Sequence, residues 1–117
     1  MNPIQKAGFE REIAQARALM SRGELQGAFA HLERAHVIGQ SHVIPHVVAH
    51  WLMLLVALRQ FQFIAAWGQV VRIIFGALGS AVGVVPTGNT GGSNVSMFKR
   101  MAIEPELQDV IAGRASD

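Results

Sequence analysis

Every histidine of the chain lies between residues 31 and 50, in a stretch that is otherwise largely apolar. Three of them, His42, His46 and His50, are four residues apart, which places side chains on one face of a helix. Two histidines at this spacing can bind one divalent ion, as in helical zinc sites. Three cannot share an ion, because the outer two are about 12 Å apart along the helix axis. Pro45 disfavours helical backbone in the residues before it, so we expect His46 and His50 to form the chelating pair.

His36 lies on the preceding predicted helix and belongs to the apolar stripe of that helix. The stripe also carries Leu25, Phe29 and Leu32. If the two helices pack antiparallel across the short turn after Gly39, His36 comes near His46. His31 projects from the opposite side of its helix, and we expect it to be exposed.

Glu33 is the acidic residue that could complete such a site, since no Asp or Glu occurs from residue 34 to 103. It lies about 60° from the His36 stripe, so it could bind an ion or orient a ligand. We therefore predict a metal site formed by His36, His46, His50 and Glu33. Imidazole and carboxylate ligands suit a divalent transition metal such as Zn, Fe, Cu or Ni.

Two other interpretations of the histidines are open at this point. They could form a structural network with hydrogen bonds to Glu33, Gln40 and backbone carbonyls. They could also take part in catalysis, which would need a nucleophile or a defined pocket. Ser41 is the only nearby hydroxyl, and no nucleophile-elbow motif surrounds it. With no recognisable catalytic motif, the first prediction is a metal-binding protein rather than a small metal-dependent enzyme.

The pattern of apolar residues predicts an all-α fold, a single-domain bundle of four main helices plus a short C-terminal helix. The expected helices span residues 3–21, 24–38, from 41 or 45 to 59, 61–78 and 104–111. Asn2, Pro3 and Gly23 are the expected start and stop residues of the first helix. We expect one domain over residues 1–117, made of an αα-hairpin (1–40), two apolar helices (41–78) and a Gly-rich loop with a short terminal helix (79–117). The hairpin is similar to one tetratricopeptide-type repeat, but no second copy follows it.

The third and fourth predicted helices carry most of the apolar surface. The back of the third helix is formed by Val48, Leu52 and Leu55. The expected core face of the fourth has Phe63, Trp67, Val70, Ile74 and Leu78, and its opposite face has Gly68, Gln69, Arg72 and Gly76. Helices this apolar are central or interfacial, so we expect a homo-oligomer or a protein partner that binds through the apolar helices.

The composition limits the classes of partner. Half of the residues are hydrophobic and only 15% are charged, against about 25% in a typical soluble domain. This composition is compatible with contact to a membrane surface, but the apolar run 73–85 is shorter than the about 20 residues of a spanning helix. The net charge of +2 comes without a basic run longer than Lys99–Arg100, so we expect no nucleic-acid partner. Cysteine is absent, which excludes thiolate ligands, and the N-terminus lacks an apolar signal-peptide region, which predicts a cytoplasmic protein.

Residues 83–90, GVVPTGNT, nearly match the phosphate-binding loop G-x-x-x-x-G-K-[ST]. Asn89 replaces the lysine that contacts the β- and γ-phosphates, and no strand is predicted before the loop. We therefore expect no nucleotide cofactor, and we interpret the stretch as a structured connection in which the glycines allow positive φ.

Five blocks of the sequence stand out together: HLERAHVIGQ (31–40), HVVAHWLM (46–53), GQVVR (68–72), VPTGNTGGSNV (85–95) and MAIEPEL (101–107). In this order they resemble a family of short bacterial proteins that is catalogued only as a domain of unknown function. The resemblance spans nearly the whole chain, and it implies a compact helical protein without an established activity. The positions in its recurring blocks are His31, Glu33, His36, Gln40, His46, His50, Met53, Gln69 and Arg72. This favours a shared site around the histidines.

Overall fold

The computed structural model describes residues 1–93 and 95–114, and within these residues it contains five helices and no strand. The helices are α1 (Pro3–Ser21), α2 (Leu25–Gly39), α3 (Val43–Arg59), α4 (Phe63–Ala81) and α5 (Pro105–Ile111). The predicted all-α fold with a short C-terminal helix is confirmed. The parts of the predicted loop and tail at residues 94 and 115–117 lie outside the described residues.

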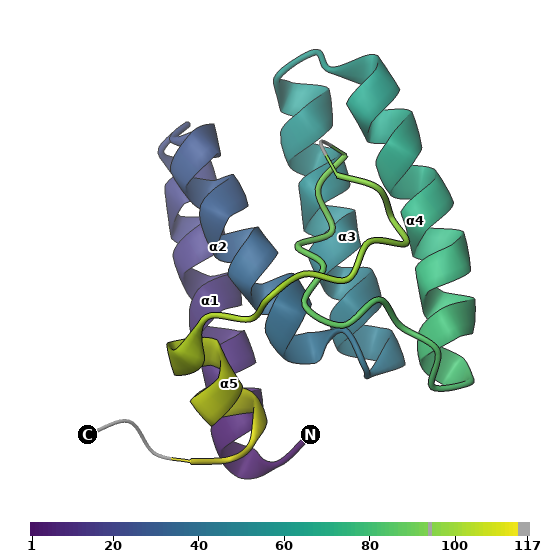
Figure 1. Cartoon of the computed structure of the whole chain (residues 1–117). Coiled ribbons are helices and arrows are strands. Elements are labelled where there is room, and N and C mark those ends of the chain that lie inside the picture. Colours follow the sequence, from purple (N-terminus) through teal and green to yellow (C-terminus); the bar gives the residue numbers. More distant parts are fainter. Residues whose placement is uncertain (94, 115–117) are drawn as a thin grey trace.

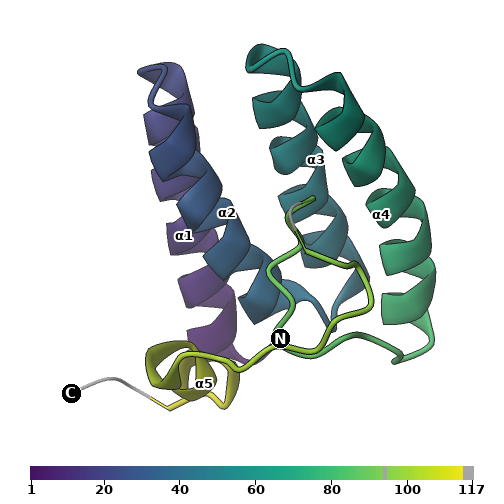
Figure 2. The same cartoon turned by 45° about the horizontal axis from the view of Figure 1, so that its top comes forward.

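The helices form two antiparallel hairpins, α1–α2 and α3–α4, that stand side by side (Figure 1). After α4 the chain runs back across α3 toward α2 and ends in α5, which lies against the first hairpin (Figures 1 and 2). The returning segment therefore joins the two hairpins on one side of the molecule.

Local signals set the ends of the first helix as expected. Asn2 is the N-cap of α1, and its side-chain oxygen accepts a hydrogen bond from the Gln5 backbone N–H at 2.7 Å. The Asn2 amide also donates to the Ile111 carbonyl at 3.0 Å, which ties α5 to the start of α1. Gly23 follows α1 with a φ of +74°, a backbone conformation that favours glycine.

The main core lies among α1, α2 and α3, with one contribution from α5. Its larger side chains are Phe9, Ile13, Met20, Leu32, Ile38, Leu52, Met53, Val56 and Leu107. Leu52 is 4% exposed, and Val48 and Leu55 pack partly buried against this core. The back of α3 is therefore largely internal, so a partner that binds through the apolar helices would have to use another face.

The orientation of α4 is the reverse of the prediction. Of the residues expected in the core, Phe63, Trp67, Ile74 and Leu78 are 55–67% exposed. Gln69, expected on the outer side, is 1% exposed and faces α3. The apolar stripe was identified correctly, but periodicity does not say whether a stripe meets the core or the outside. The inward side instead carries small and polar residues that contact the histidines.

The full length of α4 changes the assessment of a membrane-spanning segment. The helix has 19 residues and is apolar enough to cross a bilayer by these two criteria alone. The run 73–85, on which the prediction of no spanning segment was based, covers only part of it. Only 17% of the most apolar window is buried within the molecule, so α4 presents most of its apolar surface outward.

Candidate metal centre

Three histidines from two helices meet next to the turn between α2 and α3. His36 lies in the last turns of α2, and His46 and His50 lie one helical turn apart on α3. The two helices approach closely at Gly39, where an added Cβ would lie 2.6 Å from Cβ of Pro45. A glycine at this position therefore lets the short connection bring His36 against the α3 pair, as the sequence predicted.

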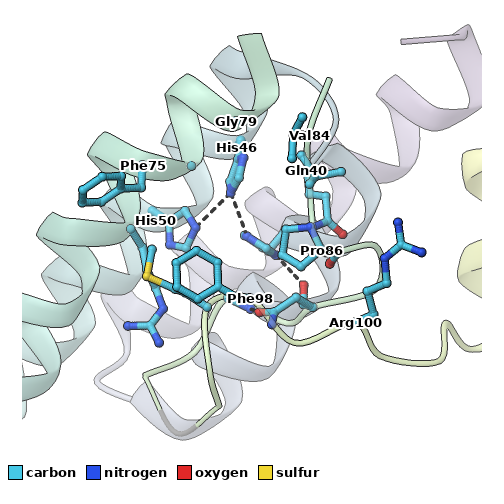
Figure 3. A pocket seen from close by; sticks show the side chains of 16 residues that line it. Gln40, His46, His50, Phe75, Gly79, Val84, Pro86, Phe98 and Arg100 are labelled. Atoms are coloured by element: carbon cyan, nitrogen blue, oxygen red, sulfur yellow. Dashed lines mark hydrogen bonds between the residues drawn. The ribbon is translucent and has the colours of Figure 1, made fainter. Parts of the chain in front are cut away.

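The imidazole rings are buried and in contact. His36, His46 and His50 are 2%, 4% and 2% exposed, and their ring centroids are 4.6–4.9 Å apart. The Nε2 of His46 is 3.0 Å from the Nε2 of His36 and 3.1 Å from the Nε2 of His50. Figure 3 shows His46 and His50 pointing toward one another beside a cavity. One ligand nitrogen from each ring lies within 4.8 Å of the others.

The Nδ1 atoms of His36 and His50 point away from this meeting point, each toward an oxygen. His36 Nδ1 is 2.7 Å from the backbone carbonyl of Asn89. His50 Nδ1 is 2.6 Å from Oε1 of Gln69, whose amide nitrogen donates to the Gly91 carbonyl at 3.0 Å. The second bond fixes which end of the Gln69 amide faces His50. Both oxygens can only accept, so both Nδ1 atoms carry a proton.

The Nδ1 of His46 also carries a proton, although here a serine hydroxyl lies between the ring and the backbone carbonyl. It lies 2.5 Å from Oγ of Ser80, and that hydroxyl donates its proton to the Gln40 carbonyl at 2.7 Å. The Ser80 oxygen is therefore left to accept from His46. All three rings are thus held as the tautomer with Nδ1–H, which leaves an unprotonated Nε2 on each.

Burial keeps the three rings neutral. It lowers the pKa of His36 well below its usual 6.5, and the charges of the neighbouring imidazoles and Arg72 act in the same direction. Burial also lowers the pKa of His46. It lowers the pKa of His50 to about 4, although the hydrogen bond to Gln69 acts in the opposite direction. At neutral pH the three Nε2 atoms therefore present lone pairs to one another without a proton between them.

The structure does not bring Glu33 into this group. Among the described residues, the group of possible metal ligands contains the three histidines alone. Glu33 is half-buried near Thr90, and burial raises the pKa of its carboxyl. The role of orienting His36, for which Glu33 was considered, is filled by the Asn89 carbonyl.

The other two histidines lie outside the cluster. His42 is the N-cap of α3 and has an extended backbone, so the helix start, which the sequence leaves open between residues 41 and 45, lies at Val43. His31 is only partly exposed, because its Nδ1 is 2.6 Å from the carboxylate of Glu12. The expectation of an exposed His31 is therefore wrong in part.

Sequence reasoning finds the groups that hold the rings only in part. Gln40 and Gln69 are among the positions of the recurring blocks, but the apolar pattern puts Gln69 on the outer side of its helix, and nothing assigns Ser80 or Asn89 to the site. For Gln69 and Ser80 a signal exists in the sequence, because each is a polar residue within a largely apolar helix. Gln40 also accepts from the Gly88 N–H at 2.9 Å and donates to the Pro86 carbonyl at 3.0 Å, so it holds the loop that resembles a phosphate-binding loop.

A cavity of about 480 Å³ lies beside the three histidines (Figure 3). Its lining is largely apolar, with Phe75, Val84, Val85, Pro86, Met97 and Phe98, and it includes Arg72 and Arg100. The Arg72 guanidinium donates to the carbonyls of Gly68 and Val95 at 3.3 and 2.8 Å. Its Nε is buried and has no hydrogen-bond partner within the described residues.

The comparisons with known proteins place the chain in a family without giving it an activity. No curated protein and no solved structure matches it significantly. A family model described as "Protein of unknown function (DUF3703)" matches residues 4–111, which is nearly the whole chain and agrees with the resemblance noted in the sequence. The chain therefore belongs to the DUF3703 family of proteins of unknown function.

Proposed function

We propose that the protein binds a divalent transition-metal ion through the Nε2 atoms of His36, His46 and His50. The observation that supports this most strongly is the tautomer of the rings, since the oxygens at each Nδ1 leave three lone pairs pointing at one place. A purely structural network pairs donors with acceptors. Here acceptors face acceptors at 3.0 and 3.1 Å, and a cation at that place removes the repulsion.

The spacing of the nitrogens supports the same proposal. Two imidazole nitrogens bound at 2.0–2.1 Å to one tetrahedral zinc ion are about 3.3 Å apart. The two Nε2 separations are shorter than this by only a few tenths of an ångström. Metal-bound histidines typically donate their other N–H to a carbonyl or carboxylate. The Nδ1 atoms of His36 and His50 do so here, and that of His46 donates to the Ser80 hydroxyl, which in turn donates to a carbonyl. The all-imidazole donor set suits Zn, Cu, Fe or Ni.

Three protein ligands leave a coordination position free, and the cavity lies beside them. Structural zinc sites usually have four protein ligands, whereas catalytic sites have three and keep an open position. The site is therefore suited to an ion that also takes a ligand from outside. A metal-dependent reaction would use the same position, so metal binding is the step to test first.

The test measures metal content and affinity on protein purified without a histidine tag. We expect one Zn²⁺ or Co²⁺ per chain by elemental analysis and calorimetry, and loss of this binding in His46→Ala and His50→Ala. His42→Ala is the matched control, because it lies on the same stretch but outside the cluster. Circular dichroism checks that each variant keeps its helices. Wild-type protein with no metal above trace and no thermal shift with Zn, Ni or Cu would contradict the proposal.

A second function, self-association, is favoured by the outer face of the α3–α4 hairpin. We define this face by its exposed apolar residues: Ile44, Trp51 and Leu58 on α3, and Ile64, Trp67, Ile74 and Leu78 on α4. The three α3 residues are seven positions apart, which puts them on one stripe. Monomeric proteins rarely expose apolar patches beyond a few hundred Å², and interfaces between identical chains are the more apolar class. We propose a second copy of the chain as the occupant, because the two charged residues of α3 and α4, Arg59 and Arg72, both donate to backbone carbonyls of the same chain.

Light scattering after size exclusion tests this second proposal. We expect a dimer or larger species for the wild type and a shift toward monomer for Trp67→Glu, since Trp67 is 67% exposed on the face. Gln15→Glu, on the exposed side of α1, adds the same charge elsewhere and should leave the mass unchanged. A wild-type protein that is monomeric at all concentrations, or that binds vesicles instead, would contradict self-association.

A further inference from the structure

The charges around the cavity beside the histidines are of one sign. Arg72 and Arg100 line it, and no Asp or Glu is among the described residues that do so. This inference rests on the proposed metal binding. A divalent ion on three neutral imidazoles would add two positive charges to this wall. Buried charge of one sign is costly unless a counter-charge accompanies it. The described lining supplies none, and an anionic ligand would provide it.

Arg72 is positioned to take part in binding such a ligand. Its two terminal nitrogens donate to the carbonyls of Gly68 and Val95, so the guanidinium is held in place in the cavity wall and cannot move without losing these bonds. Its Nε is buried and unpaired among the described residues. A buried N–H without an acceptor costs about 1–3 kcal/mol, and an anionic oxygen supplied by a ligand would satisfy it.

The volume and the apolar lining of the cavity indicate the size and chemistry of the rest of the ligand. Its volume of about 480 Å³ lies within the range of about 300–1,000 Å³ typical of small-molecule sites. Phe75, Met97 and Phe98 contribute apolar walls, which an inorganic anion would leave in contact with water. An apolar chain or ring would cover them.

We propose that the site takes a small organic carboxylate, whose head binds the metal at its open position beside Arg72 and whose apolar body fills the cavity. The metal and the carboxylate then stabilise each other, so each must raise the affinity of the protein for the other by the same factor. The class of ligand follows from three separate features: the open metal position, the unbalanced positive charge and the apolar wall.

The experiment uses the Co²⁺-loaded full chain, because the visible d–d bands of Co²⁺ report the ligands of the ion. We titrate acetate, butyrate and hexanoate, with hexanamide as the neutral control of equal length. We expect the carboxylates to change the bands and to increase Co²⁺ affinity, with binding that tightens by about three- to four-fold per added methylene. Hexanamide should cause neither change.

Two variants test the part played by charge. Arg72→Met keeps the apolar stem, so we expect it to bind Co²⁺ at least as tightly as the wild type without carboxylate but to lose most of the carboxylate effect. Arg100→Gln changes an exposed residue that also lines the cavity, and we expect it to weaken carboxylate binding less. If Arg72→Met does not fold, the wild-type series and Arg100→Gln still decide the question.

The outcomes separate this inference from metal binding itself. Co²⁺ bands that appear but do not respond to any carboxylate would overturn the inference and leave the proposed function standing. Equal affinity for acetate and hexanoate would contradict the proposal that an apolar body fills the cavity, because the apolar wall would then play no role in binding. The absence of Co²⁺ bands in the wild type would overturn both.

Discussion

Gln69 determines the tautomer of His50, although it would not itself contact the metal. Its Oε1 accepts from His50 Nδ1 and its amide nitrogen donates to the Gly91 carbonyl, so one side chain joins α3 to the loop. A buried acceptor in this position both orients the ring and increases the basicity of the opposite nitrogen.

We predict that Gln69→Leu lowers metal affinity by about 10- to 100-fold and the free energy of unfolding by about 1–3 kcal/mol. Gln69→Glu keeps an acceptor for His50 and should retain more of the affinity, although it loses the bond to Gly91. Calorimetry and chemical denaturation measure the two effects. Gln15→Leu, at an exposed position of α1, serves as the control. Metal affinity that is unchanged in Gln69→Leu would show that the acceptor does not tune the site.

The lowered pKa values predict that the metal-free protein is sensitive to acid. The pKa of His50 falls from 6.5 to about 4 on folding, so between these pH values the unfolded chain binds more protons than the folded one. The free energy of unfolding therefore decreases as the pH falls through this range, by up to roughly 3 kcal/mol for His50 alone. Denaturant titrations at pH 7.5, 6 and 5 measure this, and His50→Gln should show a weaker dependence. Stability that is constant over this range would contradict the assignment of a neutral His50.

At the scale of the elements, α4 combines an apolar outer face with an inner face of small and polar residues. The backbone of the inner face lies close to the histidine rings. An added Cβ at Gly76 would lie 2.8 Å from Cε1 of His46. Real Cβ atoms essentially never come this close to a ring, so the absence of a side chain at Gly76 determines where the His46 imidazole lies.

Gly76→Ala should therefore behave unlike an ordinary helix substitution. Alanine usually stabilises a helix by about 1 kcal/mol over glycine, but here we expect no gain in stability and a loss of metal binding, because the ring must move. Gly27→Ala on α2 is the matched control, since its nearest neighbour is the flexible Leu19 side chain at 3.3 Å. Thermal unfolding and metal titration compare the two variants. Normal metal binding in Gly76→Ala would show that the ring has room to adjust.

The same elements show what the sequence could predict. Helical spacing and a short turn were enough to bring His36, His46 and His50 together, because both features are local along the chain. Which face of α4 meets the core, and the role of Asn89, depend on contacts between residues that are 19 and 53 positions apart, and periodicity contains no information about such contacts. Glu33 was assigned by its angle on an isolated helix, and that angle does not show that the returning loop supplies the partner of His36.

At the scale of the whole molecule, the cluster connects parts of the chain that otherwise share little. His36 belongs to the first hairpin, His46 and His50 to the second, and the Asn89 carbonyl to the returning loop. A ligand that binds here binds only the folded arrangement of all three, so its binding energy adds to the stability of the whole fold.

We predict that metal stabilises the complete fold rather than one helix. At a free metal concentration of 100 times the Kd, the gain is about 2.7 kcal/mol, and EDTA should reverse it. Thermal unfolding followed by circular dichroism should show one transition whose midpoint rises with Zn²⁺. His50→Ala should show no such rise. An equal rise in the variant would mean that the ion binds elsewhere on the protein.

The oxygens that face the three Nδ1 atoms also make the site observable by magnetic resonance. Each Nδ1 proton is enclosed in a hydrogen bond to the carbonyl of Asn89, the hydroxyl of Ser80 or the amide of Gln69. Such protons exchange slowly with solvent, so the three rings should give separate downfield imidazole signals that persist in D₂O. These signals should survive the addition of Zn²⁺, because metal binds at the other nitrogen, and the nitrogen shifts of Nε2 alone should move. The Nδ1 proton and Nε2 nitrogen signals of each ring therefore show which nitrogen binds an ion, even when the ion has not been identified.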